Sequence, residues 1–402
     1  MTIAFIAQRY YPFMGGVETQ TRLVAQALQK RGHRVKVGAV NFANRNVPQR
    51  LAMLEDSLLV PPYDDFTDKG IPVRALTPTP GERLRMAPIA LRAIPRLQRY
   101  YYHELRRFGY EWYRSVYKPK LRALIAGADV VHSVAGGYLG WAAQEVAAEM
   151  DIPYVLTPYV HPGQHGDGPD DVAFYKSADA VLALLETDQG FLVDLGVPAD
   201  RIHLYGVVPL LPPEADGERF RATYDIGDAP MVLFVGRMNT YKGVPALVKA
   251  SSEVWQRHPE TRFIFCGPAT TEEERVFEGT GERIQYLGLV SEQDKADAYA
   301  ACDLFCMPST HEILPAVYLE AWSYGKPVIG GPAHGLDALI EGNDGGMVVE
   351  QQAPAIATAI NNLLDHPERR HALGANGQAL VEQRFSEEAL VRVLERVYTD
   401  VS

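Results

Sequence analysis

The stretch 304–331 constrains the fold more than any other part of the chain. It reads as an apolar strand, a turn, a short helix and a second apolar strand, which is typical of a parallel α/β sheet. Pro315 favours a helix start because its missing N–H would be unbonded there anyway, and Gly325 favours the helix end. We therefore expect Glu312 in the turn before this helix and Glu320 on it.

At the predicted helix start, 313–317, unbonded backbone N–H groups and the positive end of the helix dipole would bind an anion, most naturally a phosphate. Glu312 and Glu320 would then lie on either side of that phosphate, as carboxylates able to accept hydrogen bonds from sugar hydroxyls. This pattern indicates a nucleotide sugar. The spacing alone also fits two ordinary surface glutamates around a strand–helix–strand crossover.

Strand and helix signals continue along the chain and predict doubly wound parallel sheets. The length of 402 residues suggests two domains, at about 150 residues each. We expect the proline-rich stretch 60–80 to be loop apart from one strand, and 209–230 to connect the domains. The predicted strands are 2–7, 35–40, 71–76, 128–134, 153–160, 177–184, 201–208, 231–237, 263–269 and 284–290, and the predicted helices include 17–31, 139–149 and 386–400.

Two loops carry residues suited to phosphate. Arg237 and Lys242 follow a predicted strand close to a helix start, where Arg can bind a diphosphate bidentately and Lys acts as a point charge. Gly15 and Gly16 join the first predicted strand to the first helix, and glycines let backbone amides approach a ligand closely. Exposed loop cations and a simple tight turn are the plainer interpretations.

Together these motifs resemble the signature of retaining glycosyltransferases of family 4. They are two glutamates separated by seven residues, then an alanine and the G-K-P-V-I strand at 325–329, with Gly236-Arg237 and Lys242-Gly243 earlier in the chain. The resemblance implies the GT-B fold, an α/β architecture of two facing doubly wound domains with a cleft between them. Residues 1–207 plus 386–402 would form the acceptor-binding domain, and 208–385 the donor-binding domain.

The resemblance implies a metal-independent hexosyltransferase that takes a UDP- or GDP-linked sugar and retains the anomeric configuration, with no cofactor besides this co-substrate. The implied catalytic residues are Glu312, which would contact the transferred hexose, His161 at the end of strand 153–160, and the phosphate-binding pair Arg237 and Lys242. Glu320 would hold the ribose hydroxyls. The implied donor-binding residues are Gly15, Gly16, Gly236, Arg237, Lys242, Gly267, Leu289, Glu312, Ile313, Leu314, Ala316, Val317 and Glu320; no metal site is predicted.

Residues 81–122 have a composition of their own, with eleven basic residues against three acidic ones and many interleaved aromatics. This suits an amphipathic surface for anionic lipid headgroups or an anionic acceptor. It equally suits a pair of helices packed on the sheet with solvated arginines. We favour a lipid-linked or cell-envelope saccharide as acceptor, with a small molecule as the alternative, and peripheral membrane contact through 81–122.

The bulk properties narrow the function further. A net charge of −11 argues against nucleic-acid binding, and no apolar run reaches the roughly 18 residues that a membrane span needs. The first residues lack the basic and then apolar pattern of a signal peptide. We expect Cys266, Cys302 and Cys306 to be reduced and mostly buried, in a cytoplasmic protein.

Two other functions stay open. A nucleotide-sugar epimerase would convert the donor without any acceptor. A non-catalytic nucleotide-sugar-binding protein is favoured by two departures from the family pattern, Ile313-Leu314-Pro315 in place of Gly-Phe-Gly and Tyr205 in place of Asn. The presence of Arg237, Lys242, Glu312 and Glu320 favours the transferase.

Overall fold

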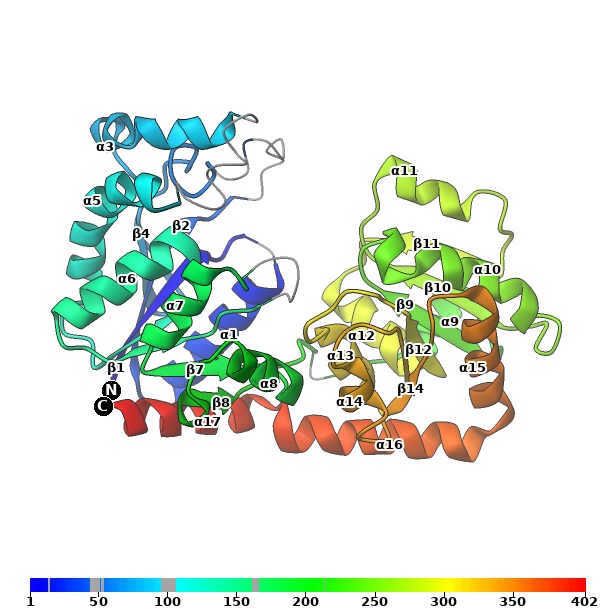
Figure 1. Ribbon diagram of the computed structural model, residues 1–402. Coiled ribbons are helices and arrows are strands. Elements are labelled where there is room, and N and C mark those ends of the chain that lie inside the picture. The colour runs from blue at the N-terminus through cyan, green and yellow to red at the C-terminus, as the bar shows by residue number, and fades with distance from the viewer. Residues whose placement is uncertain (14, 44–50, 52–53, 95–105, 161–165, 213) are drawn as a thin grey trace. The chain divides into compact units, whose positions relative to one another are not determined.

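The computed structural model describes the chain except residues 14, 44–50, 52–53, 95–105, 161–165 and 213 (Figure 1). The chain forms two compact units, each built around one sheet. Unit 1 comprises Met1–Leu184, Asp188–Tyr205 and Leu390–Ser402, and unit 2 comprises Leu185–Thr187 and Gly206–Ala389. The predicted α/β class is confirmed. In the described parts of the chain, no helix combines the length and apolar character required to cross a membrane.

The sheet of unit 1 has eight strands in the order β3-β4-β2-β1-β5-β6-β7-β8. Every pairing is parallel except that of β3 with β4 at one edge. Its central strands are mostly buried on both faces, which explains why their sequences are largely apolar. The strands are β1 (Thr2–Arg9), β2 (Arg34–Asn41), β3 (Phe66–Asp68), β4 (Ile71–Ala75), β5 (Val130–Ser133), β6 (Tyr154–Leu156), β7 (Ala180–Ala183) and β8 (Ile202–Leu204).

The edge strand β3 corrects the prediction of loop on the amino-terminal side of β4. A two-residue turn joins β3 to β4, with φ of 47° at Lys69 and 87° at Gly70. Positive φ at both central residues is the hairpin geometry that matches the twist of the strands, and glycine adopts it without strain. The proline-rich composition concealed this Lys-Gly turn signal.

Helices cover the sheet of unit 1 (Figure 1). The last of them, α17, contributes its residues from Leu390 onward to this unit, and its Tyr398 hydroxyl hydrogen-bonds Nδ1 of His132 on β5 at 2.6 Å. The helices are α1 (Gly16–Lys30), α3 (Pro80–Arg85), η1 (Ala87–Ala93), α5 (Arg106–Ile125), α6 (Gly137–Glu149), α7 (Pro169–Ser177), α8 (Glu186–Asp194), η2 (Ala199–Arg201) and α17 (Glu387–Val401).

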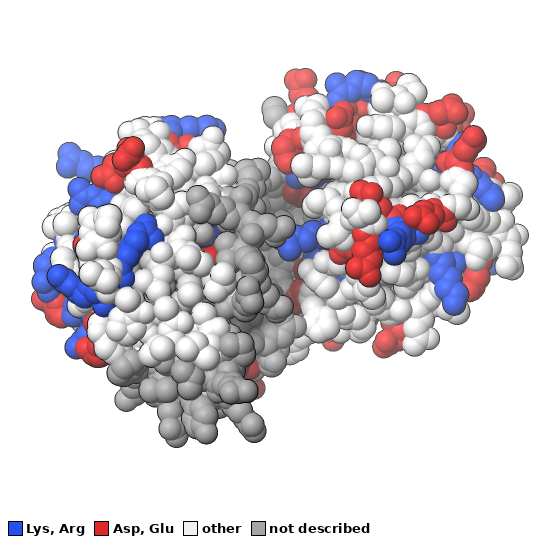
Figure 2. All heavy atoms as spheres, turned by 90° about the horizontal axis from the view of Figure 1, so that it is seen from above, with Lys and Arg blue, Asp and Glu red and all other residues white. Residues whose placement is uncertain are grey.

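Helix α5 shows what the described part of the basic, aromatic stretch does. Tyr113 and Tyr117 are buried and stack with ring centroids 4.1 Å apart. Cations among the described side chains of this helix pair with acids, as Lys118 and Arg122 both do with Glu149 on α6. On the face drawn in Figure 2, basic and acidic side chains lie intermixed. Tyr113 and Tyr117 thus belong to the core, as in the interpretation of helices packed on the sheet.

The sheet of unit 2 has six parallel strands in the order β11-β10-β9-β12-β13-β14. The strands are β9 (Met231–Val235), β10 (Arg262–Cys266), β11 (Ile284–Gly288), β12 (Leu304–Met307), β13 (Val328–Gly330) and β14 (Gly346–Val348). The helices are α9 (Gly217–Thr223), η3 (Thr240–Lys242), α10 (Val244–Val254), α11 (Thr271–Glu274), η4 (Arg275–Phe277), α12 (Glu292–Ala301), α13 (Ala316–Ser323), α14 (Leu336–Ile340), α15 (Ala353–Asp365) and α16 (Pro367–Arg384).

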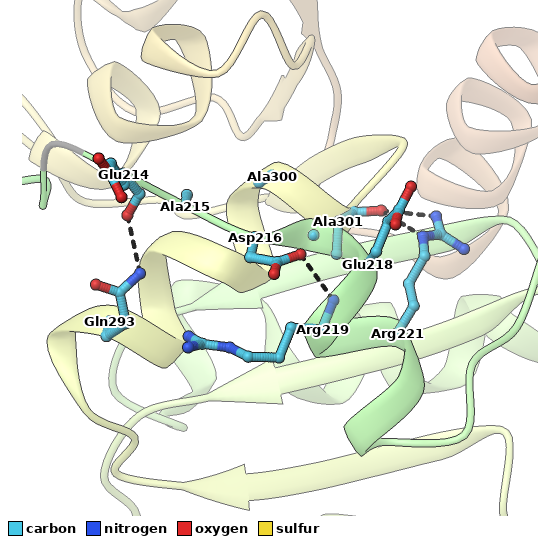
Figure 3. Close-up of a pocket in the computed structure, with 10 residues that line it drawn as sticks. Glu214, Ala215, Asp216, Glu218, Arg219, Arg221, Gln293, Ala300 and Ala301 are labelled. Carbon is cyan, nitrogen blue, oxygen red and sulfur yellow. Dashed lines mark hydrogen bonds between the residues drawn. The ribbon is translucent and has the colours of Figure 1, made fainter.

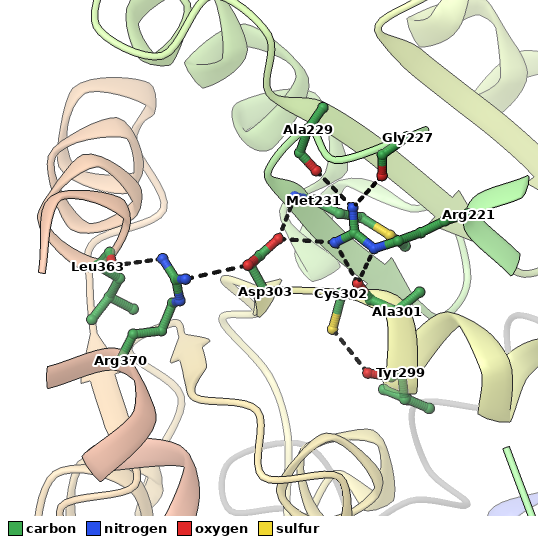
Figure 4. A network of polar contacts seen from close by, with 10 residues as sticks. All are labelled: Arg221, Gly227, Ala229, Met231, Tyr299, Ala301, Cys302, Asp303, Leu363 and Arg370. Atoms are coloured by element: carbon green, nitrogen blue, oxygen red, sulfur yellow. Dashed lines mark hydrogen bonds and ion pairs between the residues drawn. The ribbon is translucent and has the colours of Figure 1, made fainter. Parts of the chain in front are cut away.

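A polar network ties the helices of unit 2 to the amino ends of β9 and β12 (Figure 4). The carboxylate of Asp303 accepts hydrogen bonds from the backbone N–H of Met231 at 2.9 Å and from Arg221 at 3.1 Å. Arg370 on α16 lies 3.3 Å from the other oxygen of Asp303. This cluster holds the sheet at the edge opposite to the carboxyl ends of its strands.

The stretch 209–230 is more than a connection, because it contains α9. A Cβ atom at Gly217 would lie 2.9 Å from the backbone of Ala300 and Ala301, so only glycine lets α9 lie this close to α12. The two helices border a pocket of 830 Å³ (Figure 3). None of the predicted donor residues lines it.

Candidate functional site

The predicted donor site of unit 2 lies where its strand order reverses. From β9 the chain proceeds outward to β10 and β11, and then β12 returns to the other side of β9. Ligands of open parallel α/β sheets bind outside the carboxyl ends of the strands at such a switch point. The loop after β9 carries Arg237 and Lys242, and the loop after β12 carries Glu312. Two motifs about 70 residues apart in sequence therefore leave neighbouring strands at the same edge.

These two loops are fastened to each other. Gly243 has a φ of 88°, and a Cβ atom there would lie 2.6 Å from the ring of Pro308. The carbonyl oxygen of Tyr241 accepts hydrogen bonds from the backbone N–H of Thr310 at 2.9 Å and from Nε2 of Gln351 at 2.8 Å. The loop that carries the cations is thus held against the loop that carries Glu312.

Lys242 and Glu312 form an ion pair through Nζ and Oε1. Their side chains are 16% and 11% exposed, so the pair is largely withdrawn from water. Arg237 differs, since its side chain is exposed and makes no hydrogen bond or ion pair with the described residues. The site therefore has one cation that is already engaged and one that is free to meet an anion.

Helix α13 begins at Ala316, one residue later than predicted, with Pro315 as its N-cap. The ψ of 110° at Pro315 is extended, which keeps this residue outside the helix. The N–H groups of Ala316 and Val317 have no intrahelical partner because they lie in the first turn. Leu314 is buried and Ile313 half-buried, so these two can meet a ligand mainly through their backbone.

Glu320 lies on α13 about one turn from its start and is only 4% exposed. Its Oε1 is 3.1 Å from Nζ of Lys295, and its Oε2 accepts a hydrogen bond from the hydroxyl of Tyr299 at 2.8 Å. Burial raises the pKa of Glu320, while the charge of Lys295 opposes this rise. Sequence reasoning missed both partners, although their four-residue spacing on α12 places them on one helix face.

Glycines bring the carboxyl ends of β9 and β10 together. A Cβ atom at Gly267 would lie 2.0 Å from the carbonyl oxygen of Gly236, and the N–H of Gly236 donates to Cys266 at 2.9 Å. The N–H of Gly267 in turn donates to the carbonyl of Gly288 at 2.7 Å. Leu289 follows, 82% exposed. This edge offers a ligand backbone groups and few polar side chains.

The predicted residues of unit 1 are described in part. Gly15 is the N-cap of α1 and Gly16 its first residue, with open space where a side chain of Gly16 would lie. His161 lies outside the described residues. The sequence analysis missed a second glycine turn, Gly136-Gly137, which starts α6 at the end of β5, the neighbour of β1. The signal was present, since it repeats the Gly15-Gly16 pattern after a strand.

The three cysteines are unreactive, buried thiols. All three are free and buried, as predicted. Burial raises the pKa of Cys266 and of Cys302 to about 12, so neither thiol ionises readily. Across the described residues, no group of three His, Cys, Asp or Glu side chains is placed to hold a metal ion.

Comparison with known proteins identifies the family. The family described as glycosyl transferase 4-like domain matches residues 15–207, and the family described as glycosyl transferases group 1 matches residues 216–380. The chain belongs to the family 4 glycosyltransferases. The predicted resemblance and the GT-B fold are thereby confirmed. Anabaena HepE in complex with UDP matches this chain with a TM-score of 0.73 over 100% of both chains at 18% identity, which supports the fold alone.

Two curated relatives of this family 4 chain show how far the sequence similarity extends. The alpha-D-kanosaminyltransferase of Streptomyces kanamyceticus is 28% identical over 215 residues, which are 51% of this chain and 56% of that protein. The D-inositol 3-phosphate glycosyltransferase of Corynebacterium kroppenstedtii is 30% identical over 244 residues, 56% of this chain and 54% of that protein. The matched part spans about half the length of these relatives.

Proposed function

We propose that this family 4 protein transfers a hexose from a UDP- or GDP-linked donor to an acceptor hydroxyl and retains the anomeric configuration. The observation that carries the proposal is the convergence at the β9–β12 switch point. Lys242, Glu312 and the start of α13 come together there, with Arg237 on the same loop as Lys242. Cations and a helix N-terminus at one edge suit a diphosphate.

Charge on the leaving diphosphate is the main barrier that the protein addresses. The donor's phosphates would compete with Glu312 for Lys242, engage Arg237, and accept hydrogen bonds from the N–H groups of Ala316 and Val317. Preorganised donors of this kind contribute roughly 3–4 kcal/mol each to lowering a barrier. They would supply the positive charge that a divalent ion supplies elsewhere, so we propose a metal-independent reaction.

The bond changes are balanced without an assigned general base. The acceptor oxygen bonds to the anomeric carbon as the bond from that carbon to the phosphate oxygen breaks, on the same face of the sugar. The proton of the acceptor hydroxyl passes to the leaving phosphate. Glu312 would be released from Lys242 by the donor and become free to accept hydrogen bonds from the hexose.

For the acceptor we propose a hydroxylated small molecule or a lipid-linked saccharide. One relative is named for D-inositol 3-phosphate and another for kanosaminyl transfer, which favours small polyols and sugars. Membrane contact is a separate proposal. It is supported by the apolar side chains exposed on α3 and near η1, where Leu84 is 77%, Leu91 41% and Ile94 42% exposed beside the basic Arg85.

A donor panel of UDP- and GDP-sugars tests the function, read by thermal shift and by release of free nucleotide, with and without EDTA. One donor that stabilises the protein and is slowly hydrolysed regardless of EDTA is the expected result. NMR of the glycoside then reports its anomeric configuration. Stabilisation by none would favour a non-catalytic protein, and conversion to an epimeric nucleotide sugar would favour an epimerase.

A further inference from the structure

Both hydrogen-bond partners of Glu320 lie on one neighbouring helix. Lys295 and Tyr299 lie one helical turn apart on α12 and both reach across to α13. Each oxygen of Glu320 meets one of them, Oε1 meeting Nζ of Lys295 at 3.1 Å and Oε2 the hydroxyl of Tyr299 at 2.8 Å. Both oxygens of the carboxylate are therefore held by side chains of one neighbouring helix, α12.

This arrangement leaves the carboxylate with capacity for a ligand. Two carboxylate oxygens provide about four lone-pair sites, and two of these sites are occupied by protein donors. The other two can accept hydrogen bonds from a pair of vicinal hydroxyls such as those of a ribose. Because the side chain is only 5% exposed, it cannot change rotamer to follow the ligand and depends on being oriented beforehand.

Lys295 is the cationic member of the cluster, and its side chain is only 16% exposed. Its Nζ also lies 2.8 Å from Oε2 of Glu292, whose side chain is 69% exposed. The titratable groups that act on Glu320 are Lys295, Tyr299 and Glu292 from α12, together with Tyr324 just beyond α13. Lys295 is the cation among these described groups, so its charge offsets part of the cost of burying the Glu320 carboxylate, and the hydrogen bond from Tyr299 adds to this.

We propose that Lys295 is a positioning residue for donor binding, which keeps the buried Glu320 carboxylate ionised and aimed at the ribose hydroxyls. This inference rests on the proposed function, since it assigns Glu320 to the donor. Tyr299 fixes the second oxygen without adding charge. The chemistry recognised is that of a nucleoside diphosphate sugar with a free vicinal diol.

The pairing can be tested without a donor by thermal unfolding at pH 8 and pH 5.5. Lys295→Met leaves a buried, uncompensated carboxylate, so its melting temperature falls at pH 8. The loss is smaller at pH 5.5, because the raised pKa of Glu320 lets the folded state take up a proton more readily than the unfolded state. Adding Glu320→Gln to Lys295→Met recovers part of the loss. A loss that is equal at both pH values and unrelieved by Glu320→Gln overturns the pairing.

Arg370→Met is the matched control. Arg370 is also a long cationic side chain of unit 2, and it pairs with the partly buried carboxylate of Asp303 at the opposite edge of the sheet. Glu320→Gln should not relieve its destabilisation. With the donor that wild type uses, Lys295→Met should raise KM by about tenfold or more while kcat stays within about threefold, as expected for a lost charge-assisted contact. The KM effect should grow from pH 8 to pH 6, and Lys295→Arg should restore KM to within about threefold.

The outcomes separate the inference from the function on which it rests. If the wild-type protein turns over a donor and Lys295→Met has the same KM at every pH, the positioning role of Lys295 is refuted, while the proposed transferase function is not. A KM change that Arg370→Met reproduces would likewise reduce Lys295 to a structural role. If wild type binds no nucleotide sugar, the proposed function fails and takes the donor role of Lys295 with it, whatever the thermal unfolding shows.

Discussion

Replacing Lys242 by methionine separates two roles of this lysine, as the partner of Glu312 and as a ligand of the donor phosphate. Removing one member of a buried ion pair costs about 3–5 kcal/mol. With side chains that are 16% and 11% exposed, we expect a lower cost of about 2 kcal/mol in unfolding free energy. Loss of a charge-assisted contact to the donor costs about 1.5–3 kcal/mol, which is roughly 10- to 150-fold in kcat/KM.

Combining Lys242→Met with Glu312→Gln tells these roles apart. Glutamine keeps the shape of Glu312 and removes the uncompensated charge, so the double variant should regain most of the lost melting temperature. Its kcat/KM, measured by nucleotide release, should still lie at least about tenfold below that of Glu312→Gln alone. Equal kcat/KM values for the double variant and Glu312→Gln would refute the reasoning, because Lys242 would then act only through its pairing with Glu312.

Four further predictions address the site, the fold and the membrane. Arg237→Ala should lower kcat/KM by roughly 10- to 150-fold and leave the melting temperature almost unchanged, because the exposed side chain has no partner among the described residues. Gly243→Ala should lower the free energy of unfolding by about 1–3 kcal/mol, because the φ of 88° and the close approach of Pro308 both disfavour a Cβ atom there. If the variant melts at the wild-type temperature, the loop is not fixed as described. Burial lowers the pKa of His132 to about 3, so stability should fall as pH drops below about 6.5, where only the unfolded state takes up the proton, and His132→Gln should flatten this dependence in melting curves. In a flotation assay, the protein should float with vesicles that contain anionic lipid, and less of it should float after Leu84→Glu or at high salt. Flotation that does not depend on lipid charge or salt would contradict the membrane proposal.

Much of the fold was predictable because the signals are local. The strands of a doubly wound sheet are buried on both faces, so they read as short apolar runs such as Met231–Val235 and Leu304–Met307. Pro315 and Gly325 placed the helix α13 to within about one turn. Two short edge strands, β3 and β14, were missed, since each has only three residues and contributes little pattern; the edge strand β8 is equally short but was predicted within the longer apolar run 201–208.

The site was predictable to the level of its loops and not of its contacts. Residue spacing placed Glu312 in a turn and Glu320 on a helix, which holds in the structure. It could not tell that Glu320 would be buried, because burial depends on α12, whose Lys295 and Tyr299 have no distinctive motif. Nor could it tell that Tyr113 and Tyr117 enter the core, since a helix with aromatics on several faces does not say which face the sheet covers.

The two units share a topology but differ in the residues at the point where the strand order reverses. Each sheet reverses its strand order beside its first strand, at β1 and β5 in unit 1 and at β9 and β12 in unit 2. In unit 1 the helices after β1 and β5 start at glycines, Gly16 and Gly137, so the backbone is open there. In unit 2 the corresponding edge carries Lys242 paired with Glu312. Topology fixes where a ligand can bind, and side chains decide which ligand. The assignment of the diphosphate to unit 2 therefore depends on charges that mutation can remove one at a time, leaving the fold intact.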